Sequence, residues 1–373
     1  MSWPESWLRL RDRCLASARF QSWAAGHPLA SRAARRNASR LFDLCAGFVY
    51  SQILLASVEL GLLEILRSGP RTTVALSERL GLAPDRAQRL IDAAVALNLL
   101  QPRGRGRVGL GALGAMLLGN PAVLAMIRHH RLLYSDLADP VALLRDLPTG
   151  TALGDYWAYA RNGDPAQLGA QHTGGYSELM AATQPLIAAQ VLDAYPLHRH
   201  RSLLDIGGGL GEFALAAARR TPRLQCRVFD LPAMAAGAQA RFEAAGFGDR
   251  IQAIGGNFLS DPLPGGADVI SLVRVLHDHD DPAVRQLLRA VRAALAPGGT
   301  LLIAEPMIDR ATQRVGEAYF GFYLLAMGQG HARTPAQLAS LLAETGFPTW
   351  RRQPTRIPLQ CQVILTQPTV NHA

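Results

Sequence analysis

The chain has 373 residues, of which 49% are hydrophobic and 18% are charged. This composition excludes a disordered chain, and the length allows two folded domains. The net charge of +9 permits binding to nucleic acid or to an anionic membrane. All 38 basic residues are arginine, however, and such one-sided use beside abundant Ala, Gly and Leu is typical of GC-rich genomes. The charge therefore indicates a polyanionic partner only weakly.

The sequence gives no sign of a metal site or of a targeting segment. Its four cysteines stand singly and form no metal-ligand spacing, so we expect no metal and a reducing cytoplasm. The N-terminus carries charges throughout and has no apolar core of a signal peptide. The longest uncharged apolar stretch, residues 44–58, is shorter than the roughly 20 residues that span a bilayer. We therefore expect no membrane-spanning segment.

Residues 1–40 form an arginine-rich extension that carries three of the five tryptophans. On a helix, one face would collect Trp3, Trp7, Leu10 and Cys14, with the arginines at 9, 11 and 13 off that face. A basic helix with tryptophans on its apolar face suits a membrane surface. The alternative is an arm that packs on a partner subunit.

Residues 41–120 have the pattern of a winged helix, and residues 121–195 add further helices. An apolar helical segment (41–66) precedes a helix-turn-helix pattern over 72–100 and a short glycine-rich ribbon over 104–109. A DNA reader needs polar side chains along its second helix. Here that helix offers only Arg86, Gln88 and Arg89 before it turns apolar. We expect this surface to be buried at a subunit interface, with no nucleic acid bound.

Strands and helices alternate from residue 196 to about 367, as in a doubly wound sheet. We expect strands near residues 203, 227, 251, 269 and 301, and a hairpin between 349 and 365. The first strand runs into a glycine cluster with the spacing Asp205-x-Gly207-x-Gly209-x-Gly211. A dinucleotide fingerprint would need a glycine where Glu212 stands. The turn itself lets the backbone approach a nucleotide closely.

The ends of the following strands supply candidate polar groups. Asp230 ends the second strand, where a carboxylate would accept from both hydroxyls of a ribose. His277 follows the fourth strand, and Glu305 ends the fifth. A histidine oriented by a carboxylate is a general-base arrangement. We therefore expect His277 and Glu305 to be catalytic and to face one cleft.

Several of these motifs together resemble the caffeic-acid-type family of class I S-adenosylmethionine (SAM)-dependent O-methyltransferases. The shared features are the glycine turn, Leu276-His277-Asp278, Pro297-Gly298-Gly299, Glu305 and Arg333-Thr334. The resemblance covers about residues 40–367 and implies a Rossmann-like α/β catalytic domain (196–373), a winged-helix dimerisation domain (41–120), a helical substrate-lining region (121–195) and a homodimer. It implies SAM as methyl donor, with His277 as base. The implied cofactor-binding residues are Asp205, Gly207, Gly208, Gly209, Asp230, Leu231, Asn257, Phe258 and Arg274.

Residues 42–52, 128–134 and 136–145, followed by Tyr156-Trp157, resemble the bacterial branch of this family that methylates acyclic hydroxycarotenoids. That likeness implies a hydrophobic acceptor with a tertiary C1 hydroxyl, and an enzyme of the cytoplasm or peripheral on a photosynthetic membrane. The expected substrate-lining residues are Tyr134, Trp157, Met180, Phe320, Tyr323 and Met327. The alternatives are a bacteriochlorin or phenolic polyketide acceptor, or a SAM-binding winged-helix regulator.

Two positions depart from the family pattern. Asn257 stands where the family usually has Asp, and its amide oxygen could still accept from the adenine amine. Many relatives carry Glu just before the Arg-Thr pair, as a second carboxylate beside the histidine, whereas this chain has Ala332. We therefore expect Glu305 to hold the base alone, or the second group to be unnecessary for this substrate.

Overall fold

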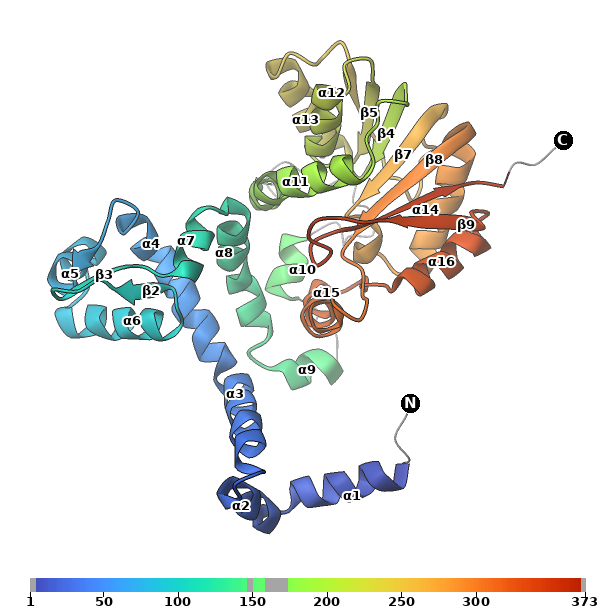
Figure 1. Cartoon of the computed structure of the whole chain (residues 1–373). Helices are drawn as coiled ribbons and strands as arrows, with labels where there is room; N and C mark the ends of the chain where they lie inside the picture. The colour runs from blue at the N-terminus through green and yellow to red at the C-terminus, as the bar shows by residue number, and fades with distance from the viewer. Residues whose placement is uncertain (1–4, 146–149, 158–173, 370–373) are drawn as a thin grey trace. The chain divides into compact units, whose positions relative to one another are not determined.

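The computed structural model describes residues 5–145, 150–157 and 174–369, and for residues 174–178, 180 and 181 only the helical backbone. The chain divides into two compact units, Met1–Gly119 and Asn120–Ala373 (Figure 1). Because each unit has its own core, we describe each by itself.

The first unit is mainly helical and contains a winged helix. Its elements are α1 (Glu5–Ala16), α2 (Ala18–Gly26), α3 (Ser31–Glu59), α4 (Leu62–Ile65), β1 (Arg71–Thr72), α5 (Thr73–Leu80), α6 (Pro84–Ala96), β2 (Leu100–Pro102), β3 (Arg107–Leu110) and α7 (Ala112–Leu118). The strands form an antiparallel sheet in the order β1-β3-β2. Thr72 caps the N-terminus of α5, and Gly81 ends it in the left-handed conformation that permits a tight turn into α6. The expected helix-turn-helix and ribbon are both present.

Helix α3 differs from the sequence-based expectation. A new helix was predicted to begin near residue 41, but α3 runs unbroken for 29 residues because neither Pro nor a capping turn interrupts it. The expected boundary at residue 40 therefore falls inside a helix. The expectation that no segment is long enough to cross a membrane was also wrong for α3, whose length and composition suffice. Ser57 and Val58, at the end of its apolar part, are buried, and Leu54 packs against the core of the unit.

The second unit carries a seven-stranded sheet with the strand order β6-β5-β4-β7-β8-β10-β9. Strands β4 to β8 are parallel, and β10 and β9 are antiparallel at one edge. The strands are β4 (Ser202–Ile206), β5 (Gln225–Asp230), β6 (Ile251–Gly255), β7 (Ala267–Val273), β8 (Leu295–Glu305), β9 (Thr349–Gln353) and β10 (Gln362–Gln367). The five expected parallel strands and the hairpin are all found.

Helices precede, join or cover the strands of this sheet (Figure 1). They are α8 (Pro121–Asp136), α9 (Pro140–Arg145), α10 (Ala152–Tyr156), α11 (Gly174–Ala194), α12 (Glu212–Arg220), α13 (Pro232–Ala244), the short 3₁₀ turn η4 (Leu276–Asp278), α14 (Asp281–Ala294), the π-helix η5 (Arg314–Phe320), α15 (Gly321–Met327) and α16 (Pro335–Glu344). Neighbouring residues of a strand belong to different cores: Leu203 packs with the cluster that contains Phe213, and Leu204 packs with the cluster that contains Leu287. This alternation buries both faces of the sheet and fixes where each strand ends.

Candidate active site

The glycine turn joins β4 to α12 and brings the backbone close to two carboxylates. Gly207, Gly209 and Gly211 have φ angles of 65°, 56° and 76°, a left-handed conformation that favours glycine. A Cβ at Gly208 would lie 2.5 Å from Oδ2 of Asp205, so this position also excludes a side chain. At Gly211, a Cβ would collide with the Phe242 ring.

Asp205 and Asp230 both lie beside this turn. The Ser271 hydroxyl donates to Oδ1 of Asp205 at 2.6 Å, while Oδ2 is buried without a hydrogen-bond partner. Burial raises the pKa of Asp205 to about 7, against the lowering effect of Ser271. The two oxygens of Asp230 accept from the amides of Gly209 and Leu231, each at 2.7 Å. The Asp230 carboxylate therefore fixes the shape of the turn, and burial nevertheless raises its pKa.

Asn257 and Phe258 follow β6, and Phe258 borders the same turn. The ring of Phe258 would lie 3.8 Å from a Cβ at Gly207, and its edge faces His279 at 5.3 Å between ring centroids. Oδ1 of Asn257 accepts from the amide of Leu259 at 3.0 Å. The amide oxygen expected to accept from adenine thus already has a backbone partner.

Arg274 follows β7 directly and has a left-handed φ of 58°. Its amide donates to the carbonyl of Ala304 at 2.8 Å, and its guanidinium donates to Oγ1 of Thr183 on α11 at 3.0 Å. A non-glycine residue held in this conformation stores strain of the kind that collects at functional sites. Its guanidinium is placed toward α11, and a role toward the cofactor stays a prediction.

These features fit SAM as the cofactor. The glycine turn leaves no room for side chains at the place where a nucleotide would contact the backbone. Oδ2 of Asp205 is a buried hydrogen-bond acceptor without a partner, which fits a ligand that carries a positively charged hydrogen-bond donor. Asp230, Leu231 and Phe258 lie around the turn, where they would contact the adenosine part. The described residues hold no cluster of three or more His, Cys, Asp or Glu side chains suited to a metal ion.

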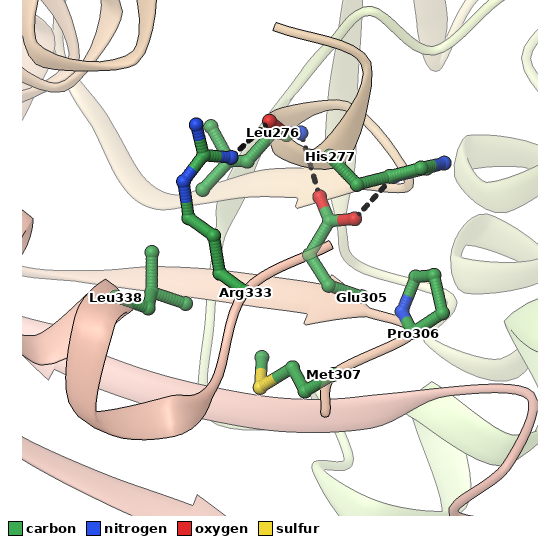
Figure 2. Close-up of a pocket in the computed structure, with 7 residues that line it drawn as sticks. All are labelled: Leu276, His277, Glu305, Pro306, Met307, Arg333 and Leu338. Carbon is green, nitrogen blue, oxygen red and sulfur yellow. Dashed lines mark hydrogen bonds and ion pairs between the residues drawn. The ribbon is translucent and has the colours of Figure 1, made fainter. Parts of the chain in front are cut away.

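His277 and Glu305 form a buried pair at the end of the sheet (Figure 2). Nδ1 of His277 lies 2.5 Å from Oε2 of Glu305. The other oxygen, Oε1, accepts from the amides of Val275 and Leu276 at 2.9 and 2.7 Å. Three donors therefore fix the Glu305 carboxylate, and the carboxylate in turn fixes the ring.

A second carboxylate also reaches the ring, and the sequence-based reading missed it. Nε2 of His277 lies 3.1 Å from Oδ1 of Asp278, so the expectation that Glu305 alone holds the base was wrong. Ala332, where relatives carry Glu, is buried and supplies no such group. Burial lowers the pKa of His277, but the charges of Asp278 and Glu305 outweigh it and raise that pKa above 6.5. In the sequence, only the position of Asp278 directly after His277 could have indicated this contact.

Arg333 holds the segment that carries the base (Figure 2). Its buried guanidinium donates to the carbonyls of Leu276 at 2.6 Å and His279 at 2.7 Å, and to Oδ1 of Asp281 at 2.7 Å. Gly330 lies so close that a Cβ there would collide with the carbonyl of His277. The small pocket behind the base is lined by Leu276, His277, Glu305, Pro306, Met307, Arg333 and Leu338.

Aromatic side chains from α8, α10, η5 and α15 pack beside the base. The Phe320 ring meets that of His277 edge to face at 6.1 Å. Trp157, Tyr323 and Met327 belong to one buried cluster, and Tyr134 borders it through the ring of His130 at 6.2 Å. Of the predicted lining residues, Phe320 thus contacts the ring of His277, and the side chain of Met180 lies outside the described residues.

Two histidine–tyrosine pairs in this cluster were not expected from the sequence. Nε2 of His129 lies 2.7 Å from the Tyr323 hydroxyl, which also accepts from the Trp157 indole at 2.8 Å. Nε2 of His130 lies 2.7 Å from the Tyr319 hydroxyl. Burial and the neighbouring His130 lower the pKa of His129 to about 4, so this ring is neutral at physiological pH. The pairs tie α8 to η5 and α15, across nearly two hundred residues of chain.

The sheet order, the glycine turn and the two carboxylates beside it define a class I SAM-dependent methyltransferase. An O-methyltransferase family model matches residues 134–348, and the family's dimerisation-domain model matches residues 42–120. The chain belongs to this O-methyltransferase family and is a SAM-dependent enzyme. Its dimerisation domain supports a homodimer.

Individual relatives cover nearly the whole chain. Demethylspheroidene O-methyltransferase of Cereibacter sphaeroides is 43% identical over 91% of this chain and 89% of the relative. The protein of the same name from Rhodobacter capsulatus is 41% identical over 90% of this chain and 84% of the relative. Human N-acetylserotonin methyltransferase in complex with SAM has a TM-score of 0.72 at 26% identity, covering 89% of this chain and 98% of the human one.

Proposed function

We propose that this enzyme methylates the tertiary C1 hydroxyl of an acyclic hydroxycarotenoid such as demethylspheroidene, with His277 as the general base. The observation that carries the chemistry is the buried His277–Glu305 pair at 2.5 Å. The acceptor class rests on the relatives named demethylspheroidene O-methyltransferase. Bound SAM supplies an electrophilic methyl group.

His277 has to take the hydroxyl proton during methyl transfer. A tertiary alcohol is a far weaker acid than an imidazolium with a pKa of about 6.5, so the proton cannot leave beforehand. His277 would therefore accept the proton at Nε2 while the hydroxyl oxygen takes up the methyl group that bound SAM would supply. Base catalysis of this kind contributes about 10²–10⁴-fold.

The two carboxylates stabilise the charge that develops on the ring. Glu305 accepts a hydrogen bond from the Nδ1–H group throughout the reaction. The lone pair of Nε2 therefore stays available to take a proton. Asp278, at 3.1 Å from Nε2, accepts from the proton that arrives there. Both interactions strengthen His277 as a base, at the cost of keeping more of it protonated at low pH.

The aromatic cluster suits an apolar acceptor. Phe320 lies against His277, and behind it Tyr319 and Tyr323 have their hydroxyls bonded to histidines. The rings of these residues would then offer their faces and edges to an apolar acceptor. Holding the hydroxyl oxygen against the methyl group would supply about 7–11 kcal/mol of the barrier reduction.

The test compares turnover with SAM on three acceptors: a 1-hydroxylated acyclic carotenoid, a bacteriochlorophyllide and a catechol. We expect methyl ether formation on the carotenoid, with a preference of at least about a hundredfold in kcat/KM over the other two. The variant H277A should lose at least tenfold in methyl transfer with SAM affinity intact. If the enzyme preferred the bacteriochlorophyllide or the catechol, the proposed carotenoid acceptor would be wrong. If H277A turned over at a near-normal rate, His277 would not be the general base.

A further inference from the structure

The positive charge of this chain is concentrated in its N-terminal arm, which we define as residues 5–41. Up to residue 40 the arm contains eight arginines and only two acidic residues, and so holds six of the nine net positive charges. The remaining chain is nearly balanced. The charge of the whole protein is therefore a local property of one segment.

The same arm exposes large apolar side chains. Trp7, Leu10 and Leu15 on α1 are 43%, 61% and 47% exposed, and Trp23 on α2 is 54% exposed. Helix α1 contributes no buried residue, and α2 contributes only Ala24. Burial within its own unit therefore does not explain why these residues are apolar.

Helix α1 separates the two kinds of side chain by face. At 100° per residue, Trp7, Leu10 and Cys14 fall within an arc of about 60°, whereas Arg9, Arg11 and Arg13 lie outside that arc, with Arg9 farthest from it. Tryptophan and arginine both suit the boundary between water and lipid, because each carries an apolar body with a polar end. A helix of this kind lies flat in the headgroup region.

Charge also decides against a second copy of the chain as the occupant of this face. Two arms placed together would bring six net positive charges against six. The arm also lies before residue 42, where the dimerisation-domain model begins. The exposed apolar residues of α3 from Phe42 onward fall inside that model, so we assign them to the dimer interface and exclude them from the arm.

We propose that the arm is a membrane-docking surface that binds anionic phospholipid, with α1 and α2 lying in the headgroup layer and the arginines of residues 9–40 on lipid phosphates. The surface follows from charge and exposure alone. Only its purpose, bringing the enzyme to a lipid-dissolved acceptor, rests on the proposed function. The binding test below uses no acceptor, so it can fail or succeed independently of that function.

The experiment measures flotation of the full chain with phosphatidylcholine vesicles, with and without phosphatidylglycerol. We expect binding to the anionic vesicles that weakens with added salt. An arginine near an anionic surface contributes about fivefold in partitioning, so R13Q/R19Q should lose about 25-fold. W7A/L10A should lower vesicle partitioning by a similar factor, because it removes two apolar side chains from the face of α1 that would enter the lipid.

Matched controls remove the same groups elsewhere. R105Q/R107Q takes two charges from the exposed β2–β3 turn, and W350A/I357A takes two exposed apolar side chains from the second unit. Both should bind vesicles as the unaltered protein does, and circular dichroism should show all four variants folded. Arm variants that bind normally, or that change the oligomeric state in light scattering while lipid binding is unchanged, would overturn the proposal.

Discussion

Oε2 of Glu305 and Nδ1 of His277 lie 2.5 Å apart, and the other carboxylate oxygen accepts from two backbone amides. Glu305 therefore fixes both the tautomer and the orientation of the ring, because a carboxylate accepts at both oxygens.

The first prediction concerns E305Q. The glutamine oxygen can face either the backbone amides or the ring, and when it faces the amides its NH₂ group points at Nδ1 and moves the ring proton to Nε2. We expect kcat to fall by about 10²–10⁴-fold, measured by single turnover, with the Kd for SAM unchanged in calorimetry. E317Q, on the exposed part of η5, is the matched control. Turnover of E305Q within about threefold of the unaltered enzyme would show that Glu305 does not orient the base.

The second prediction concerns pH and Asp278. Burial lowers the pKa of His277, but Asp278 and Glu305 raise it above 6.5, and only the neutral ring accepts a proton. The rate of methyl transfer should therefore rise with pH through that raised pKa. Because D278N removes one of the raising charges, it should shift this acid limb to lower pH and lower the plateau. A pH–rate profile of single turnovers measures the position of the acid limb and the height of the plateau. If the acid limb of D278N stayed at the same pH, Asp278 would not affect the pKa of His277.

The same pair links pH to stability. The protonated ring is favoured in the folded state, so its contribution is fully present below pH 6.5 and is lost as pH rises through the folded pKa. D278N should reduce this loss, and urea unfolding at several pH values reports it.

The third prediction compares two glycines with the same backbone. Gly330 and Gly266 both have a φ of 82°, but only Gly330 is close to other atoms, those of His277 and Asp278. G330A should displace the base and lower kcat by at least about tenfold. G266A carries the same left-handed strain without the contact, and should cost about 1 kcal/mol of stability with kcat unchanged. Equal kcat values for the two variants would contradict the role of this close approach.

The fourth prediction compares two tyrosines. Y323F removes the hydroxyl that bonds to His129 and to Trp157, and leaves the buried His129 nitrogen without this partner. We expect a loss of about 1–3 kcal/mol in the free energy of unfolding. Y319F removes the bond to the half-buried His130 and should cost less. Urea denaturation measures both, and a larger loss for Y319F would refute the ranking.

Local patterns in the sequence were enough to predict the sheet and to single out the candidate site residues at its strand ends. Alternating strands and helices place Asp205, Asp230, His277 and Glu305 at the ends of parallel strands, and those ends meet at one edge of a sheet. The glycine spacing excluded a dinucleotide fingerprint because Glu212 stands at the required position. These inferences need only short-range information.

The remaining features depend on how distant segments pack. Nothing in the sequence indicates that Arg333 reaches back to the carbonyls of Leu276 and His279, or that His129 meets Tyr323. The length of α3 was missed because a change from arginine-rich to apolar composition does not end a helix.

The sequence by itself determined the methyl donor and singled out His277 as the candidate base: the spacing of Gly207, Gly209 and Gly211 and the strand-end position of His277 are properties of local chain order. Only the tertiary structure decided how the base is held, by Glu305 on one ring nitrogen and Asp278 on the other, with Arg333 behind the loop. The reason is physical. A strand's length and direction follow from its own residues, whereas the direction of a side chain at its end is set by the groups that other segments pack against it.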